Sequence, residues 1–168
     1  MPFSMYSASV PVFVRMLNNM LGWLDKAEAH AKAKKFDPNN WVGVRLTPDM
    51  LPFSAQIGIA SDAAKGCVSR LAGVEVPKWE DKEVTLDELR ARIRKTIDYV
   101  QSVPAAKIEG SEAREITMPM PSGPMKFSGE PLLTGLSMPN FMFHCTMTYA
   151  LLRHGGVEIG KGDYLGAP

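Results

Sequence analysis

The chain has 168 residues, of which 45% are hydrophobic, and its 19 Lys and Arg residues nearly balance 18 Asp and Glu residues, for a formal net charge of +1. This length predicts one domain, residues 1–168, large enough to bury about 70% of its unfolded surface. The balanced charge argues against a nucleic-acid binder, which would carry a clear basic patch. No apolar run approaches the ~20 residues of a membrane span, and no signal peptide is recognisable.

The two cysteines, Cys67 and Cys145, lie far apart and form no zinc-ligand or C-x-x-C pattern. Each falls in a predicted helix, where a free thiol usually behaves as a small buried apolar group. We therefore expect reduced thiols and a cytoplasmic protein. The 11 methionines are many for this length, and they suit core packing or the wall of an adaptable pocket.

The first predicted helix runs from about Ser9 to Lys35, where apolar residues recur every three or four positions. Its stripe consists of Val10, Phe13, Val14, Leu17, Leu21 and Leu24. A turn is expected over Phe36–Asn40, which is rich in Asp, Pro and Asn.

The second helix is expected to open at Thr47-Pro48-Asp49, an N-cap residue followed by a proline and an acid suited to the first turn. Gly73 is expected to end it. The predicted buried stripe is Phe53, Ile57, Ala60, Ala64, Val68 and Leu71. The opposite face is small and polar, with Gly58, Asp62, Lys65, Gly66 and Ser69. Its glycines would let another backbone approach, either within the bundle or across a dimer.

The third helix is predicted to start with a capping box, Thr85 to Glu88, and to end before Pro104. Its apolar stripe is Leu86, Leu89, Ile93, Ile97 and Val100. The basic residues Arg90, Arg92, Arg94 and Lys95 are expected on the solvent face. There, Glu88 with Arg92 and Arg94 with Asp98 have the spacing of helical ion pairs.

The apolar period changes to two between Ile116 and Phe127, around the turn Pro121–Pro124. This predicts a short hairpin that must pack on the helices, because a two-stranded ribbon is marginal alone. A short helical or turn segment is expected over Glu130–Ser137. A last long helix then runs over Pro139–His154 and ends at Gly155.

The C-terminal tail is expected to pack through Tyr164 and Leu165. Four amphipathic helices with a hairpin before the last one predict an all-α bundle.

Four segments together resemble one known family: Arg45–Met50 (RLTPDM), Ile59–Gly66 (IASDAAKG), Pro139–Phe141 with His144, and Leu152–Val157 (LRHGGV). The resemblance is to a bacterial family of domains of unknown function within the DinB/YfiT-like superfamily, and it covers essentially the whole chain. It implies a DinB-like up-and-down four-helix bundle, often dimeric. Many members of the superfamily hold a divalent metal, typically nickel or zinc, and some are thiol-cofactor-dependent transferases or isomerases.

The metal site of such members uses three histidines, one from the second helix and two from an H-x-x-x-H pair on the last long helix. In this chain His144 falls on the second histidine of that pair, and Asn140 stands at the first position. The second helix has no histidine, and Gln56 and Asp62 are its nearest polar substitutes. One of three ligands therefore matches.

Asn140, His144 and Thr148 are four residues apart, so they share one face of the last helix. An imidazole there, beside Asp62 or Gln56, could hold a metal or act as a general base. The alternative is a core histidine whose ring nitrogens are satisfied by Asn140 or a backbone carbonyl. A metal-free binding pocket lies between these interpretations.

Other candidate residues have simpler explanations. His154 stands in a last helical turn, where a cation complements the helix dipole, and His30 is expected to be solvated. Asp62 and Lys65 could pair on the surface. Trp23, Trp41 and Trp79 could wall a pocket for an apolar ligand, and packing explains them equally well.

Three hypotheses follow. The first is a cytoplasmic homodimer that binds a small molecule, or keeps a degenerate nickel or zinc site, in a pocket around His144 with Asn140, Thr148, Asp62 and Gln56. The second is a metal- or thiol-cofactor-dependent transferase or hydrolase of the DinB/YfiT type, with His144 as ligand or base. The third is a structural dimerisation module without a site. The sequence names neither a substrate nor a reaction.

Overall fold

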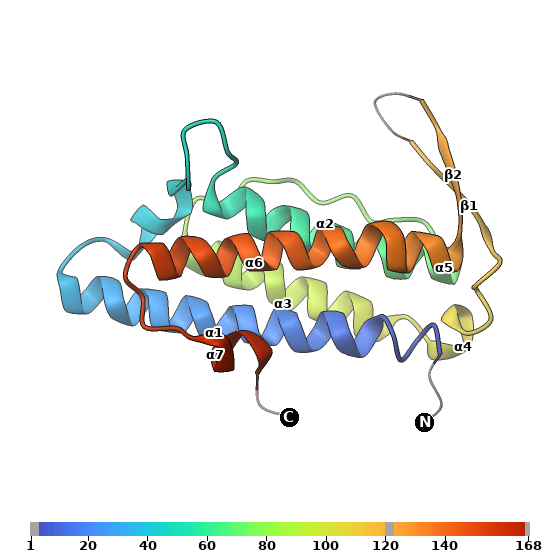
Figure 1. Cartoon of the computed structure of the whole chain (residues 1–168), viewed down its shortest axis with the longest axis horizontal. Coiled ribbons are helices and arrows are strands. Elements are labelled where there is room, and N and C mark those ends of the chain that lie inside the picture. Colours follow the sequence, from blue (N-terminus) through green and yellow to red (C-terminus); the bar gives the residue numbers. More distant parts are fainter. Residues whose placement is uncertain (1–3, 120–122, 167–168) are drawn as a thin grey trace.

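The computed structural model describes residues 4–119 and 123–166. Four long helices form a bundle (Figure 1): α1 (Val10–Lys34), α2 (Phe53–Ala72), α3 (Leu86–Ser102) and α6 (Met138–His154). Helix α2 packs against α3 and α6, and α1 packs against the same two helices from the other side. The all-α class and the four-helix bundle are confirmed, whereas the single-domain division of residues 1–168 stays a prediction.

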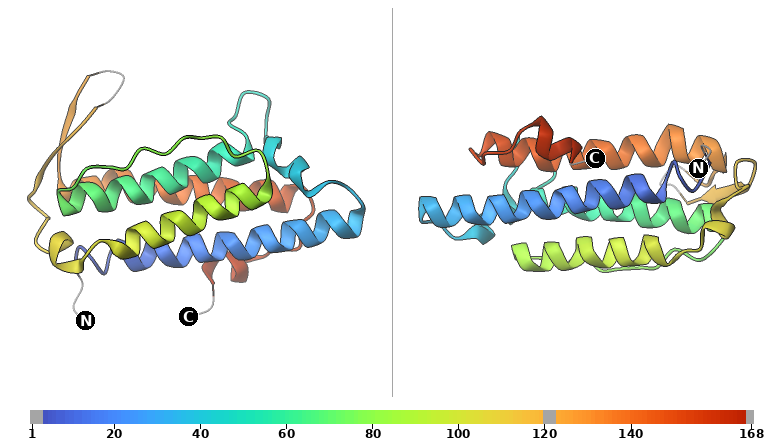
Figure 2. Two further views of the ribbon diagram at one scale, coloured as in Figure 1. Left: turned by 180° about the vertical axis from the view of Figure 1, so that it is seen from behind. Right: turned by 90° about the horizontal axis from the view of Figure 1, so that it is seen from below.

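Helices α2 and α3 run in the same direction, and α1 and α6 run in the opposite direction (Figures 1 and 2). This order needs a long connection, and residues 74–84, which we call the crossing segment, supply it by returning along the length of the bundle. The crossing segment lies over α2 and α3 with Val76, Pro77 and Trp79 partly buried. This crossover was not predicted from the sequence.

Helix α2 begins five residues later than predicted. Thr47 and Asp49 form a turn instead, in which Oγ1 of Thr47 donates to the Asp49 carboxylate at 2.6 Å. Pro52 explains the delay, because its ring excludes helical backbone angles at the preceding residue, and the helix starts directly after it at Phe53. Gly73 ends α2 as predicted, with a left-handed φ of 68°.

Helix α3 has the predicted capping box: Oγ1 of Thr85 accepts from the backbone N–H of Glu88, and the Glu88 carboxylate accepts from the N–H of Thr85. The predicted solvent face is wrong at two positions, because Arg90 and Arg92 are only 6% and 4% exposed. They are covered because α3 lies between α1 and the crossing segment, and both of these carry carboxylates.

Arg90 bonds to Asp25 and Glu28 of α1 and to Asp87 of its own helix. Arg92 bonds to carboxylates of α2 and the crossing segment, so it does not pair with Glu88 as expected. Arg94 and Lys95 are exposed as predicted.

The hairpin is confirmed, with strand β1 (Glu115–Met118) antiparallel to β2 (Met125–Ser128) and Ile116 opposite Phe127. Its packing differs from the expectation. Ile116 is buried against the core, but the ribbon extends away from the end of the bundle (Figure 1), and Met125 is exposed. The predicted turn residues Pro121 and Ser122 lie outside the described residues.

The last helical run starts earlier than predicted. A short helix α5 (Gly129–Pro131) leads into a π-helical turn η2 (Leu132–Ser137), which continues without a break into α6 (Figure 1). Pro139 has no N–H to donate to the carbonyl four residues earlier, and the chain adopts the wider π turn just before it. The expected short segment over Glu130–Ser137 is therefore part of one long helical run.

Smaller elements complete the fold: η1 (Pro38–Gly43), α4 (Ala105–Ile108) and α7 (Lys161–Leu165). The tail packs through Tyr164, whose ring stacks on Trp23 at 5.5 Å, but Leu165 is exposed, so half of that prediction is wrong. His30 is partly buried against the rings of Phe36 and Trp41 rather than solvated. None of the described helices has the length and apolar character required to cross a membrane.

The core fills the space between the four long helices. Phe13 of α1 and Phe141 of α6 meet edge to face at 4.9 Å across its centre. Cys67 and Cys145 are free thiols within it, as predicted. Burial raises the pKa of the Cys67 thiol to about 11, so this group stays protonated near neutral pH.

Candidate functional site

His144 lies on α6 where that helix packs against α2, and its residue is 8% exposed. Its Nδ1 is 2.7 Å from Oε1 of Gln56 on α2. The amide nitrogen of Gln56 donates to the carbonyl of Leu51 at 3.0 Å, so the amide oxygen is the group that faces the imidazole. This network assigns the proton to Nδ1 and leaves the lone pair on Nε2.

The imidazole of His144 is neutral near pH 7, because burial lowers its pKa below the usual 6.5. The Phe143 ring stands edge-on to it, with 5.1 Å between ring centroids. Thr148 contacts the backbone of His144 rather than its ring, since Oγ1 donates to the carbonyl at 2.9 Å. The result is a neutral ring held by Gln56 in one tautomer, with Nε2 able to accept a proton or a hydrogen bond.

Asp62 lies on a different face of α2 from Gln56. Its carboxylate bonds to Nζ of Lys65 at 2.7 Å and to Nη2 of Arg92 at 3.0 Å. The predicted pair of Asp62 and Lys65 therefore exists, although Lys65 is buried rather than on the surface. Asp62 consequently offers no ligand to His144.

Asn140 is exposed and lines a pocket of about 350 Å³ that we call the α2–α6 pocket. Its polar lining is Asp62, Arg70, Ser137 and Asn140, and its apolar lining is Ile59, Ala63, Met118 and Leu136. Asn140 stands one helical turn before His144, about 6 Å along the axis, and His144 itself is not among the residues that line the pocket. The five predicted site residues thus form two neighbouring groups: Gln56, His144 and Thr148 in the helix interface, and Asn140 with Asp62 at the pocket.

These residues do not fit the three-histidine metal centre that the resemblance implies. Oε1 of Gln56 is used by Nδ1 of His144, and the carboxylate of Asp62 is held by two cations. Within residues 4–119 and 123–166, no group of three or more His, Cys, Asp or Glu side chains is arranged to hold a metal ion. A transition-metal site generally needs at least three protein ligands.

Arg70, which was not among the predicted site residues, also lines the α2–α6 pocket. Its guanidinium lies back over Gly66, where a Cβ would clash with Nη1. In the part of the chain that the structure describes, this guanidinium makes no hydrogen bond and no ion pair, and partial burial lowers its pKa. A glycine four residues before an arginine was the one sequence signal for this arrangement.

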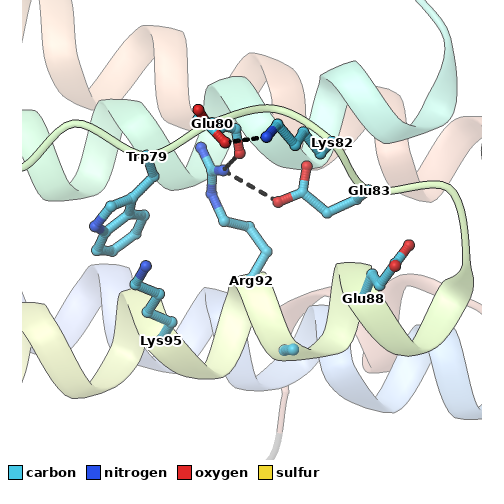
Figure 3. A pocket seen from close by; sticks show the side chains of 8 residues that line it. Trp79, Glu80, Lys82, Glu83, Glu88, Arg92 and Lys95 are labelled. Carbon is cyan, nitrogen blue, oxygen red and sulfur yellow. Dashed lines mark hydrogen bonds and ion pairs between the residues drawn. The ribbon is translucent and has the colours of Figure 1, made fainter.

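A second pocket, of about 300 Å³, lies between the crossing segment and α3 (Figure 3). The Trp79 ring faces Nζ of Lys65 at 4.2 Å and Nζ of Lys95 at 4.5 Å. Arg92 donates to the Glu80 carbonyl at 3.1 Å in addition to its carboxylate partners. Trp79 therefore lines a charged pocket rather than an apolar one, and its neighbours are paired within the protein. The contacts that line this pocket hold the crossing segment against the bundle.

Comparisons with known proteins agree with the fold. The family model described as "Domain of unknown function (DUF1993)" matches residues 5–165. The crystal structure of a DinB family member protein from Shewanella denitrificans is 38% identical and superposes with a TM-score of 0.89, covering 97% of this chain and 92% of that chain. Among curated proteins, no match is found. The chain therefore belongs to the DUF1993 family of unknown function, and its fold is DinB-like.

Proposed function

We propose that the protein binds a small molecule in the α2–α6 pocket, with Nε2 of His144 as a hydrogen-bond acceptor beside it. The observation that carries this proposal is the 2.7 Å bond from Nδ1 of His144 to Gln56. Nε2 of His144 is not one of the buried side-chain atoms that lack a partner, so burial alone does not require a ligand there. Nδ1 is fixed by Gln56, and no described protein group bonds to Nε2, which leaves this nitrogen available to accept a hydrogen bond from a ligand.

The test is a ligand-detected NMR screen of small soluble molecules against the wild type and the His144→Ala variant. We expect molecules that bind the wild type to lose at least tenfold in affinity in His144→Ala. The matched control is His154→Ala, which removes an exposed histidine from the same helix and should bind normally. If no molecule binds the wild type, or binding persists in His144→Ala, the proposal fails and the structural-module hypothesis gains.

A second candidate uses the same pair for catalysis. The free lone pair of a neutral imidazole can take a proton from a thiol or from water, as a thiol-cofactor-dependent transferase or a hydrolase requires. A loss of turnover in His144→Ala with binding retained would favour this enzyme over a binding protein. The pH profile would then report the imidazole directly.

Three further expectations are proposals, and each can be tested by a direct measurement. A nickel or zinc ion at His144 is tested by elemental analysis of untagged protein, and clearly substoichiometric metal would remove it. The homodimer that the DinB resemblance implies is tested by light scattering over a dilution series, and a monomer at every concentration would contradict it. The cytoplasmic location is tested by fractionation of the source cells.

A further inference from the structure

We propose that the molecule bound in the α2–α6 pocket carries a carboxylate, and that the guanidinium of Arg70 binds it. This inference rests on the proposed function, because it names the chemical class of the ligand of the same pocket. It makes Arg70, rather than a residue of the superfamily's metal site, the group that selects the ligand.

The guanidinium of Arg70 is partly exposed, and none of its N–H groups is a buried atom cut off from a partner. A guanidinium has five N–H donors, and those of Arg70 bond to no protein group among residues 4–119 and 123–166, which leaves them available to a ligand. Partial burial also removes water from this charge, and a bound anion would compensate that loss. A planar guanidinium matches a carboxylate with two parallel hydrogen bonds.

Gly66 lies beneath the guanidinium of Arg70, and a side chain at this position would displace Nη1. The chain thus keeps the space that Arg70 occupies clear without placing an acid against it. Arg70 also stands in the last turn of α2, where a cation complements the helix dipole, so a stabilising role alone must be tested against binding.

The amide of Asn140 and the hydroxyl of Ser137 supply further polar groups to the pocket, while Ile59 and Leu136 are apolar. The pocket volume of about 350 Å³ lies at the small end of ligand sites. These features fit a short aliphatic body attached to the acid group.

The nearby charge favours a monoanion over a phosphate. Asp62 lines the same pocket, and its carboxylate is already paired with Lys65 and Arg92. A dianionic phosphate would bring two negative charges into this pocket, and Arg70 could balance only one of them. A carboxylate brings one charge, which Arg70 balances.

The experiment is calorimetric titration of the full chain at low ionic strength with butyrate, with the neutral isostere butyramide and with inorganic phosphate. We expect butyrate to bind at least tenfold more tightly than either comparison compound, and added salt to weaken its binding. Equal affinity for butyrate and butyramide overturns the inference. Tighter binding of phosphate overturns the assignment of a carboxylate.

Three variants locate the effect, with circular dichroism to confirm folding. Arg70→Gln should lose at least tenfold in butyrate affinity. Gly66→Ala should weaken it as well, because it displaces the guanidinium without changing the charge. Arg114→Gln is the matched control, since Arg114 lies over Gly73 at the same end of α2 but does not line the pocket, and it should stay within twofold. An equal loss of butyrate affinity in Arg114→Gln would show that Arg70 acts only through the net positive charge of the protein and not by contacting the ligand.

The two proposals fail separately. If butyrate binding depends on Arg70 but not on His144, the acid site stands and the proposed role of His144 falls. If neutral molecules bind through His144 and Arg70→Gln changes nothing, the carboxylate inference falls and the binding function remains.

Discussion

Two arginines on neighbouring helices, Arg92 of α3 and Arg70 of α2, show opposite uses of the same side chain. Arg92 is surrounded by three carboxylates and a carbonyl, and it joins α2, α3 and the crossing segment. Arg70 is also partly withdrawn from water, yet no described acid pairs with it. The charge of Arg92 is paired with acids of the protein, whereas the charge of Arg70 has no described acidic partner and is available to a ligand.

The largest expected effect is on Arg92. Arg92→Ala should lower the free energy of unfolding by about 2–3 kcal/mol, measured by urea denaturation. We expect less than the loss for a fully buried pair, because the side chains of Asp62 and Asp81 are 46% and 70% exposed and remain hydrated. The control Arg94→Ala changes an exposed residue of the same helix and should cost under ~0.5 kcal/mol. Equal effects of the two variants would show that the Arg92 cluster does not hold the crossing segment.

The next effect concerns the Gln56–His144 pair. His144→Ala removes a buried hydrogen bond and some packing, so the free energy of unfolding should fall by about 1–2 kcal/mol near pH 7.5. The measurement is again urea denaturation, with His154→Ala as the exposed control.

The same pair predicts a pH dependence. Burial lowers the folded pKa of His144 below 6.5, so the unfolded chain takes up the proton first. This contribution to stability is complete above about pH 6.5 and declines as the pH falls toward the folded pKa. The gap in stability between wild type and His144→Ala should therefore narrow from about pH 7.5 to pH 5. A gap that stays constant or widens would mean that the ring is not held neutral.

The smallest effect is on Cys67, which precedes Arg70 by one helical turn. Its thiol pKa of about 11 leaves almost no thiolate at pH 8, so it provides no counter-charge for Arg70. Iodoacetamide should therefore leave Cys67 of the native protein unmodified over hours, in the wild type and in Arg70→Gln alike, as mass spectrometry would show. Rapid alkylation that depends on Arg70 would reveal a thiolate–guanidinium pair and would remove the argument for a free cation.

Much of the fold follows from local rules that act within a few residues. The Thr85 capping box, the Gly73 helix end and the alternation around Ile116 and Phe127 were predicted because each depends on neighbouring positions alone. The false helix start at Thr47 arose from the same local reasoning, because the restriction that Pro52 places on the residue before it was not weighed against the capping pattern.

The candidate site was predicted only in part. The shared face of Asn140, His144 and Thr148 follows from helical spacing, and Gln56 was one of two residues expected to face the histidine. The other, Asp62, is six residues further along α2, which places it about 120° around the helix axis. The sequence could not choose between them, because that choice depends on the rotation of α2 against α6.

The sequence by itself determined where the four long helices and the hairpin lie, since apolar periodicity, caps and prolines act locally. The tertiary structure decided that α3 runs parallel to α2, because only packing shows where the crossing segment lies. It also decided which arginine is paired with acids: the acids of α2 and the crossing segment surround Arg92, and none of them reaches Arg70. Ion pairing depends on distances between side chains far apart in sequence, and those distances exist only in the assembled bundle.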